Sequence, residues 1–259
     1  IESYDLFFID LWGVVHNGIE LYKEAVDVLT KISEAKKEYI LLTNAPRPKK
    51  NVEDFLEKMG LEKNKREKVF TSGEAALSFL NKKHLNQNFY HIGPPRDFDL
   101  FIDFKKNKTE SINKSDYLLC TGLYDNHDED LNYYKEFLVN HISKKMICTN
   151  PDLVVDRGTK REYCAGSIAL VFEKLGGQVA YFGKPHPEVY TQSTNTTEKK
   201  IIAIGDNLRT DIKGANNMNY DSLFITDGIH NKEVKKEGVE SILKKYGVKI
   251  SYYQKELKW

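Results

Sequence analysis

The chain of 259 residues fits one large domain or two smaller ones, and either is long enough to bury a hydrophobic core. Lys and Arg total 39 and Asp and Glu total 38, so a net charge of +1 excludes the long-range field by which proteins hold nucleic acid or an anionic membrane. No apolar run approaches the roughly 18 residues of a membrane span, and Cys120, Cys148 and Cys164 are too scattered for a disulfide framework or a zinc cage, so we expect a cytoplasmic protein that binds neither membranes nor nucleic acid.

The first predicted elements alternate between short apolar runs and amphipathic segments. Residues 4–10 (YDLFFID) predict a buried strand, residues 22–36 carry apolar side chains at helical spacing, and residues 38–44 predict a second strand. This order is typical of a parallel sheet with a right-handed crossover. A helix is expected next at residues 51–60, ending at Gly60.

A middle segment of roughly 110 residues is too long to be a loop and has its own apolar pattern. Its predicted strands lie at residues 88–93, 115–123 and 144–150, and its predicted helices at residues 71–83, 131–142 and 165–176. Further strands are expected at residues 178–184, 199–206 and 222–228. The predicted fold class is therefore α/β, with a doubly wound parallel-sheet core at 1–68 and 182–259 and an inserted α/β cap domain at 69–181.

Polar residues at the carboxyl ends of these strands form the candidate site, because ligands of open α/β sheets bind there. They are Asp10, Thr43, Asn44, Lys184, Asp206 and Asp211. Asp10 alone is more often a structural residue, and Asp211 could equally be an acid in the first turn of a helix, where the macrodipole favours it. Three acids at one sheet edge would repel one another without a cation, and their hard oxygens suit Mg²⁺.

Two other strand ends carry groups suited to an anion. Thr43 and Asn44 offer a hydroxyl and an amide in LLTNAPRP, where the prolines prevent an immediate helix. Lys184 lies between a glycine and a proline in GKPHP, although a lysine in that setting is often only a surface residue. Together with the acids, these groups form a specific constellation for a phosphate and a metal ion.

The order of these motifs resembles the haloacid dehalogenase superfamily, whose members are mostly Mg²⁺-dependent phosphohydrolases. The matching segments are FFIDLWGV with Asp10, LLTN with Thr43, GKP with Lys184, and IGDNLRTD with Asp206 and Asp211. The long insertion between the second and third motifs resembles the class IIA branch, which includes phosphatases of sugar phosphates and p-nitrophenyl phosphate. FTSGEAALSFL, CTNPDLVVDRG and CAGSIALVFEKLGG are similar to the cap of that branch.

The resemblance implies that Asp10 attacks phosphorus and forms an aspartyl-phosphate, which water then hydrolyses. It implies that Mg²⁺ is held by Asp10, the backbone carbonyl of Trp12 and Asp206, with Asp211 close by. Thr43, Asn44 and Lys184 would neutralise the phosphoryl oxygens.

The substrate is expected to be a small phosphorylated molecule, such as a sugar phosphate, a nucleotide or an aryl phosphate. Residues proposed to contact it or its phosphate are Arg47, Asp125, Asn150, Asp152, Arg157 and Asn207. Asn150–Pro151–Asp152 could equally be a structural turn. The cap's apolar helices also leave pairing with a second copy of the chain open.

Trp12 departs from the family pattern, because a second aspartate normally stands there, protonates the leaving group and later activates water. An indole does neither at neutral pH. Losing general acid–base catalysis costs about 10²–10⁴-fold in rate, or roughly 3–5 kcal/mol of barrier. The enzyme would then act on good leaving groups, or another residue would supply the acid, with Asp125, His127 and His16 as candidates.

Two further hypotheses remain open at this point. The protein could bind metal and phosphate with little or no turnover. It could also be a metal-independent hydrolase of the dehalogenase type, which carries an aromatic residue at that position. Asp206 and Asp211 argue against the second hypothesis, because the dehalogenase route needs no metal.

Overall fold

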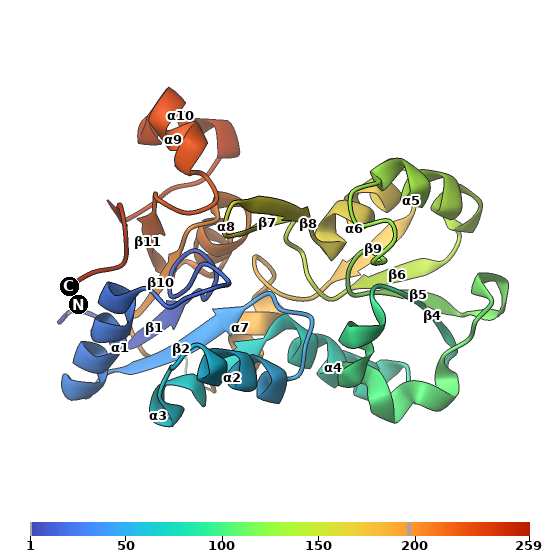
Figure 1. The fold of residues 1–259 in the computed structure, drawn as a ribbon, viewed down its shortest axis with the longest axis horizontal. Coiled ribbons are helices and arrows are strands. Elements are labelled where there is room, and N and C mark those ends of the chain that lie inside the picture. Colours follow the sequence, from blue (N-terminus) through green and yellow to red (C-terminus); the bar gives the residue numbers. More distant parts are fainter. Residues whose placement is uncertain (1, 196–197) are drawn as a thin grey trace.

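The computed structural model describes residues 2–195 and 198–259, which form two parallel sheets and a hairpin (Figure 1). The first sheet has six strands in the order β12-β11-β10-β1-β2-β3. Their bounds are Leu6–Ile9 (β1), Glu38–Thr43 (β2), Val69–Thr71 (β3), Ile201–Gly205 (β10), Asp221–Ile225 (β11) and Tyr252–Gln254 (β12). The chain runs outward from β1 to β3 and later resumes on the other side of β1 at β10. This reversal makes the carboxyl ends of β1 and β10 the topological switch point, where open α/β sheets bind ligands.

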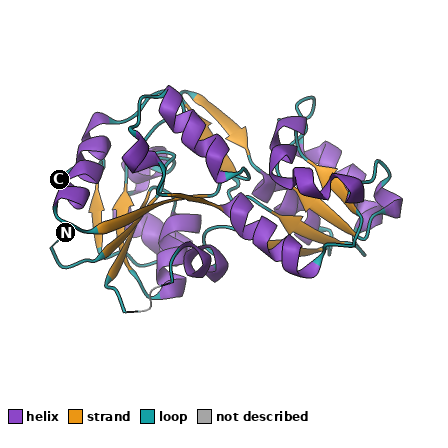
Figure 2. Ribbon diagram, turned by 90° about the horizontal axis from the view of Figure 1, so that it is seen from below, coloured by secondary structure: helices purple, strands orange, loops and turns teal. Residues whose placement is uncertain are grey.

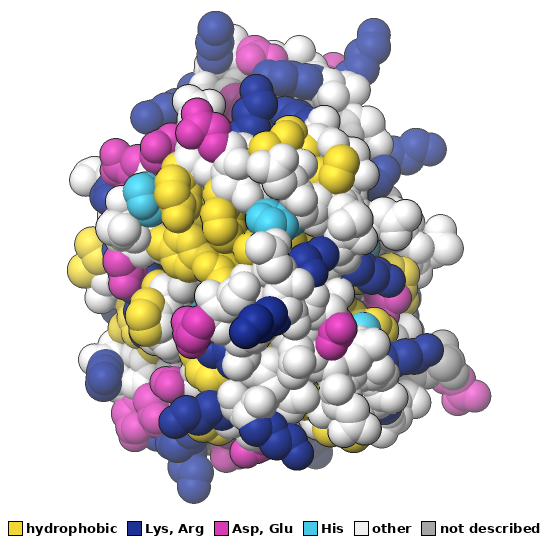
Figure 3. Space-filling model, turned by 90° about the vertical axis from the view of Figure 1, so that its right-hand side faces the viewer, with side chains coloured by type: hydrophobic (Ala, Val, Ile, Leu, Met, Phe, Trp, Pro, Cys, Tyr) yellow, Lys and Arg dark blue, Asp and Glu magenta, His cyan; other side chains and the backbone are white. Residues whose placement is uncertain are grey.

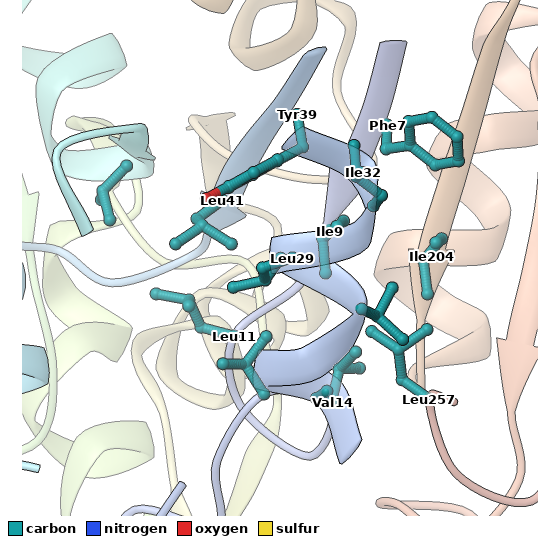
Figure 4. Close-up of a cluster of buried hydrophobic side chains, with 14 of the residues drawn as sticks. Phe7, Ile9, Leu11, Val14, Leu29, Ile32, Tyr39, Leu41, Ile204 and Leu257 are labelled. Atoms are coloured by element: carbon teal, nitrogen blue, oxygen red, sulfur yellow. The ribbon is translucent and has the colours of Figure 1, made fainter. Parts of the chain in front are cut away.

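Helices cover both faces of the first sheet because the side chains of β1 alternate between the two faces. Phe7 and Ile9 pack with α1 (Lys23–Glu34) and α2 (Lys49–Lys58), as the cluster in Figure 4 shows for Phe7, Ile9, Leu29 and Ile32. Leu6 and Phe8 share the opposite cluster with α4 (Ser72–Lys83), α7 (Pro187–Ser193) and α8 (Lys213–Met218). The remaining helices of this part are α3 (Lys63–Arg66), α9 (Asn231–Glu237) and α10 (Val239–Tyr246).

The second sheet lies in the inserted segment and has the order β4-β5-β6-β9. Its strands are β4 (Phe89–Ile92), β5 (Tyr117–Cys120), β6 (Lys145–Cys148) and β9 (Gln178–Tyr181). One face packs against α5 (Leu131–Leu138) and α6 (Ala165–Lys174). Three 3₁₀ segments complete this part, at Pro95–Asn107, Ile112–Lys114 and Val139–His141. Figure 2 shows the two sheets as two lobes that meet at the centre of the molecule.

An antiparallel hairpin, β7 (Val154–Arg157) and β8 (Lys160–Tyr163), connects β6 to α6. Backbone contacts tie it to the first domain, since the N–H of Gly158 donates to the carbonyl of Asn17 at 3.2 Å. The side chain of Arg161 donates to the carbonyl of Ile229 at 3.1 Å. The hairpin therefore spans from the inserted segment to the loops of the first sheet.

The predicted fold class is confirmed, and two details differ from expectation. β3 pairs with β2, so the first sheet extends to Thr71, beyond the boundary expected at residue 68. β9 pairs with β6, so Lys184 follows the last strand of the inserted sheet rather than a strand of the first sheet. The assignment of residues 69–181 to a cap domain stays a proposal in its exact bounds. Within the described ranges, no helix combines the length and apolar character needed to cross a lipid bilayer.

The outer end of the inserted segment exposes hydrophobic side chains beside histidines (Figure 3). Exposed apolar residues in this part of the chain include Ile102, Val139 and Ile142. Self-association through the cap stays a prediction.

Candidate active site

Three carboxylates meet at the switch point of the first sheet. Asp10 follows β1, and Asp206 follows β10, which pairs in parallel with β1. Asp211 lies in one π-helical turn, Leu208–Ile212, directly after β10. One carboxylate oxygen from each residue lies within 4.8 Å of the others, and all three residues are buried. The sequence prediction that these acids converge agrees with this geometry.

Glycines allow this close approach. A Cβ on Gly13, which has a φ of +81°, would lie 2.1 Å from Oδ2 of Asp206. A Cβ on Gly205 would lie 2.1 Å from Cγ of Asp211. Both positions therefore require glycine for the carboxylates to occupy their observed positions.

Lys184 connects two of the acids. Its Nζ forms ion pairs with Asp10 and, at 2.7 Å, with Oδ1 of Asp211, and it donates to the carbonyl of Leu42 at 2.8 Å. The side chain of Asn44 holds the backbone of Lys184 from both sides, accepting from its N–H at 2.7 Å and donating to its carbonyl at 3.1 Å. Asn44 thus positions Lys184, a role that the sequence did not predict.

The charges of this cluster do not balance, because one ammonium group faces three carboxylates. Burial raises the pKa of Asp10, and Lys184 opposes that rise while Asp211 reinforces it. Burial also raises the pKa of Asp206 well above its usual range, and the charges of Asp10 and Asp211 add to the effect. Burial lowers the pKa of Lys184, but the carboxylates outweigh it and hold that pKa above its usual range. A divalent cation would relieve this repulsion, and the buried oxygen donors fit Mg²⁺.

A cavity of about 760 Å³ opens beside the carboxylates and reaches the inserted segment. Thr43 lies on its wall, buried, with its hydroxyl accepting from the N–H of Ala45 at 3.2 Å. The cavity also brings together every residue that the sequence analysis proposed as a substrate contact: Arg47, Asp125, Asn150, Asp152, Arg157 and Asn207. Among them, Arg47 pairs with Asp97 at 3.1 Å and Asp125 pairs with Arg96.

The indole of Trp12 contacts the hairpin. Its Nε1 donates to the carbonyl of Asp156 at 2.5 Å, and the guanidinium of Arg157 lies 5.0 Å from its ring centroid. The indole also stacks on Phe55, with centroids 6.3 Å apart and planes 9° apart. Sequence reasoning missed these contacts because Trp12 and Asp156 are separated by 144 positions and no local pattern relates them.

Two of the candidate replacement acids are not supported. His16 is buried, and its Nδ1 accepts from the N–H of Gly18 at 3.0 Å. Burial, reinforced by Arg157, lowers its pKa to about 4, so the imidazole is neutral at pH 7 and no imidazolium is available as the acid. His127 stacks on Tyr133 at 3.6 Å and is not among the described residues that line the cavity.

Comparison with known proteins agrees with the motifs and the fold. The family model for haloacid dehalogenase-like hydrolases matches residues 7–104, and a second model for HAD-like hydrolases matches residues 181–246. A crystal structure of a haloacid dehalogenase-like hydrolase from Brucella suis 1330 superposes with a TM-score of 0.86 at 30% identity, over 99% of this chain and 96% of that one. The chain belongs to the haloacid dehalogenase superfamily, in its class IIA branch of hydrolases with an inserted cap.

Curated relatives cover nearly the same length. The 5'-nucleotidase YutF of Bacillus subtilis is 24% identical over 244 residues, which are 90% of this chain and 91% of that protein. An acid sugar phosphatase of Staphylococcus epidermidis is 25% identical over 247 residues, 90% of each chain.

Proposed function

We propose that the protein is a Mg²⁺-dependent phosphatase of small phosphorylated molecules that uses Asp10 as its nucleophile. The observation that carries this proposal is the convergence of Asp10, Asp206, Asp211 and Lys184 beside one cavity. The names of the relatives, a 5'-nucleotidase and an acid sugar phosphatase, support a phosphate monoester as substrate.

In this mechanism, a carboxylate oxygen of Asp10 attacks phosphorus, and water then hydrolyses the aspartyl-phosphate. When bound, Mg²⁺ would supply positive charge that neutralises the phosphoryl group. Asp10, Asp206, Asp211 and the backbone carbonyl of Trp12 would hold it. A carbonyl ligand does not depend on the side chain, so tryptophan at position 12 is compatible with the metal site.

The other residues of the site bind and orient the phosphoryl group. Lys184, fixed by Asn44, and the hydroxyl of Thr43 would stabilise its charge as the bond to the leaving group breaks. Substrate contacts are proposed for Arg47, Asp125, Asn150, Asp152, Arg157 and Asn207. We also place the protein in the cytoplasm, because its three cysteines are buried and unpaired.

One observation favours an alternative, a protein that binds metal and phosphate with little turnover. The Trp12 indole N–H is directed at the hairpin, so position 12 offers no proton donor to a leaving group, as expected of a metal- and phosphate-binding protein with little turnover. A metal-independent dehalogenase route is not favoured, because it gives no reason for three buried carboxylates to converge.

The proposal is tested by hydrolysis of p-nitrophenyl phosphate with and without Mg²⁺, for the wild-type protein and for Asp10→Asn. Asp227→Asn is the matched control, because Asp227 is an exposed acid at the cavity wall. We expect Mg²⁺-dependent turnover that Asp10→Asn abolishes and Asp227→Asn retains. Turnover that survives Asp10→Asn would refute the nucleophile, and tight binding of Mg²⁺ and phosphate without turnover would establish the binding protein instead.

A further inference from the structure

The position of Trp12 leaves the proposed reaction without its usual proton donor, so another group of the cavity would have to supply the proton. A general acid must present a protonated group to the leaving oxygen and must not be held in an ion pair. Most carboxyl groups of the cavity fail this condition. Those of Asp97, Asp125, Asp156 and Glu162 pair with arginines, and those of Asp128 and Glu129 pair with Lys160.

Asp152 is different from these acids. It lines the cavity and has no ion pair within 4.0 Å among residues 2–195 and 198–259. Its Oδ1 accepts a hydrogen bond from Nδ2 of Asn207, at 3.3 Å, and Asn207 directly follows the proposed metal ligand Asp206. Hydrogen bonds with the side chains of Asn44 and Thr210 also act on the carboxyl group. The carboxyl group therefore lies beside the proposed phosphate site without a direct ion pair, and the charge of Lys184 acts on it from a greater distance.

The backbone holds Asp152 firmly in this place. Its N–H donates to Oδ1 of Asn150 at 3.0 Å, which closes a turn in the link from β6 to β7. A Cβ on Gly166, at the start of α6, would lie 2.3 Å from the carbonyl of Pro151 and 2.5 Å from that of Asp152. The turn is thus packed directly on α6, as an acid that must meet a substrate in a fixed position requires.

We propose that Asp152 is the general acid and base of this enzyme, in the role that residue 12 has in the usual motif. The inference rests on the proposed phosphatase function. It differs from the substrate contact predicted for Asp152 from the sequence, because it assigns a proton transfer to this carboxyl group.

The electrostatic setting supports that role. Burial raises the pKa of Asp152 to about 6, with Lys184 opposing the rise and Asp211 reinforcing it. A carboxyl group that titrates near neutrality can both donate and accept a proton during one cycle. The other titratable groups that interact with Asp152 are Asp10, Cys148 and Cys164.

The proton transfers balance in two steps. Asp10 forms a bond to phosphorus, the bond from phosphorus to the substrate oxygen breaks, and the carboxylic acid of Asp152 protonates that oxygen to give an alcohol. The Asp152 carboxylate then accepts a proton from water as the water oxygen attacks phosphorus. Inorganic phosphate leaves, the Asp10 carboxylate is regenerated, and Asp152 is again protonated.

Asp152→Asn tests this through the dependence on the leaving group. Nitrophenolate leaves without a proton, whereas an alkoxide needs one, so kcat/KM for glycerol 2-phosphate should fall about 10²–10⁴-fold while kcat/KM for p-nitrophenyl phosphate changes less than about tenfold. The variant should also release a burst of p-nitrophenol before a slow steady state, because the base for the second step is missing. Asp152→Glu keeps a carboxyl group and should keep the wild-type ratio of the two kcat/KM values, and Asp227→Asn is the matched control.

Equal losses for both substrates, or no loss, would overturn the role of Asp152. If Asp10→Asn abolishes turnover of both substrates and Asp152→Asn lowers both equally, this inference alone fails. If wild-type protein hydrolyses neither substrate, the phosphatase proposal and this inference fail together. If Asp152→Asn does not fold, the ratio for Asp152→Glu decides, since a changed ratio would count against the proposal.

Discussion

The indole of Trp12 should hold the β7–β8 hairpin against the first domain. Two substitutions separate its contacts. Trp12→Phe removes the hydrogen bond to the Asp156 carbonyl and keeps a ring beside Phe55, whereas Trp12→Ala removes both, together with the contact to Arg157. The hydrogen bond is worth about 1 kcal/mol. The stack and the cation–π contact together add roughly 1–2 kcal/mol.

Hydrogen–deuterium exchange of a peptide covering the hairpin measures the opening that these contacts oppose. The N–H of Gly158 is protected by its bond to Asn17, so it exchanges when the hairpin leaves the first domain. At RT of about 0.6 kcal/mol, a loss of about 1 kcal/mol raises the exchange rate roughly fivefold, and a loss of about 2–3 kcal/mol raises it roughly 30–150-fold. We expect the first change for Trp12→Phe and the second for Trp12→Ala.

The chain provides a matched control in Trp259, the second of its two tryptophans, which is 49% exposed near the C-terminus. Trp259→Phe should leave exchange of the hairpin unchanged. A peptide from α6 (Ala165–Lys174) should exchange at the wild-type rate in all variants. Unchanged exchange of the hairpin in Trp12→Ala would refute the reasoning, since the indole would then contribute nothing to docking.

Three further outcomes are expected. Two double variants, Asp152→Asn with Trp12→Asp and Asp152→Asn with Trp12→Asn, test the account of Trp12. The variant with Trp12→Asp should have a kcat/KM for an alkyl phosphate about tenfold or more above that of the variant with Trp12→Asn, because only aspartate restores a proton donor. Equal kcat/KM values would contradict the account of Trp12. Gly205→Ala should weaken Mg²⁺ binding in calorimetry and lower the free energy of unfolding by about 1–3 kcal/mol, because its Cβ would overlap Asp211; wild-type affinity would be inconsistent with the close approach. Burial would raise the pKa of Glu233, but hydrogen bonds from Lys245, His230 and Tyr246 lower it from 4.5 to about 2. The ionised Glu233 therefore stabilises the folded protein above pH 4.5, and this stabilisation is lost as the pH falls toward 2. Urea unfolding of Glu233→Gln should therefore show a deficit of up to about 1 kcal/mol at pH 7 that shrinks as the pH falls to 3, and a deficit independent of pH would speak against the ion pair.

The first domain was predictable because its signals are local. Buried strands at residues 4–10 and 38–44 and the helix at 22–36 have strong apolar periods, and β1, β2 and α1 fall within those ranges. The β7–β8 hairpin was not predicted, because its strands have four residues each, β7 has only two apolar side chains and is partly buried, and β8 is mostly polar and exposed. Its position depends on contacts with the first domain rather than on its own sequence pattern.

In the candidate site, too, some features were predictable from the sequence and others were not. The acids were predictable because Asp10 and Asp206 each follow a buried strand, Asp211 lies in the turn directly after β10, and parallel strands bring such ends to one edge. The role of Asn44 was not, because it depends on a hydrogen-bonded contact with a residue 140 positions away. From the sequence, the amide of Asn44 is a candidate phosphate ligand. The structure shows that it instead hydrogen-bonds the backbone of Lys184 and so positions that residue.

Tryptophan replaces the usual aspartate at position 12, and this replacement affects the backbone and the side chain of residue 12 differently. Under the proposed function, residue 12 offers only its backbone carbonyl to the cation, so its side chain is free to change without loss of the proposed metal site. The indole hydrogen-bonds the β7–β8 hairpin, and Asp152 lies in the link between β6 and that same hairpin. Under the proposed mechanism, the proton donor is supplied by the inserted segment rather than by the first domain.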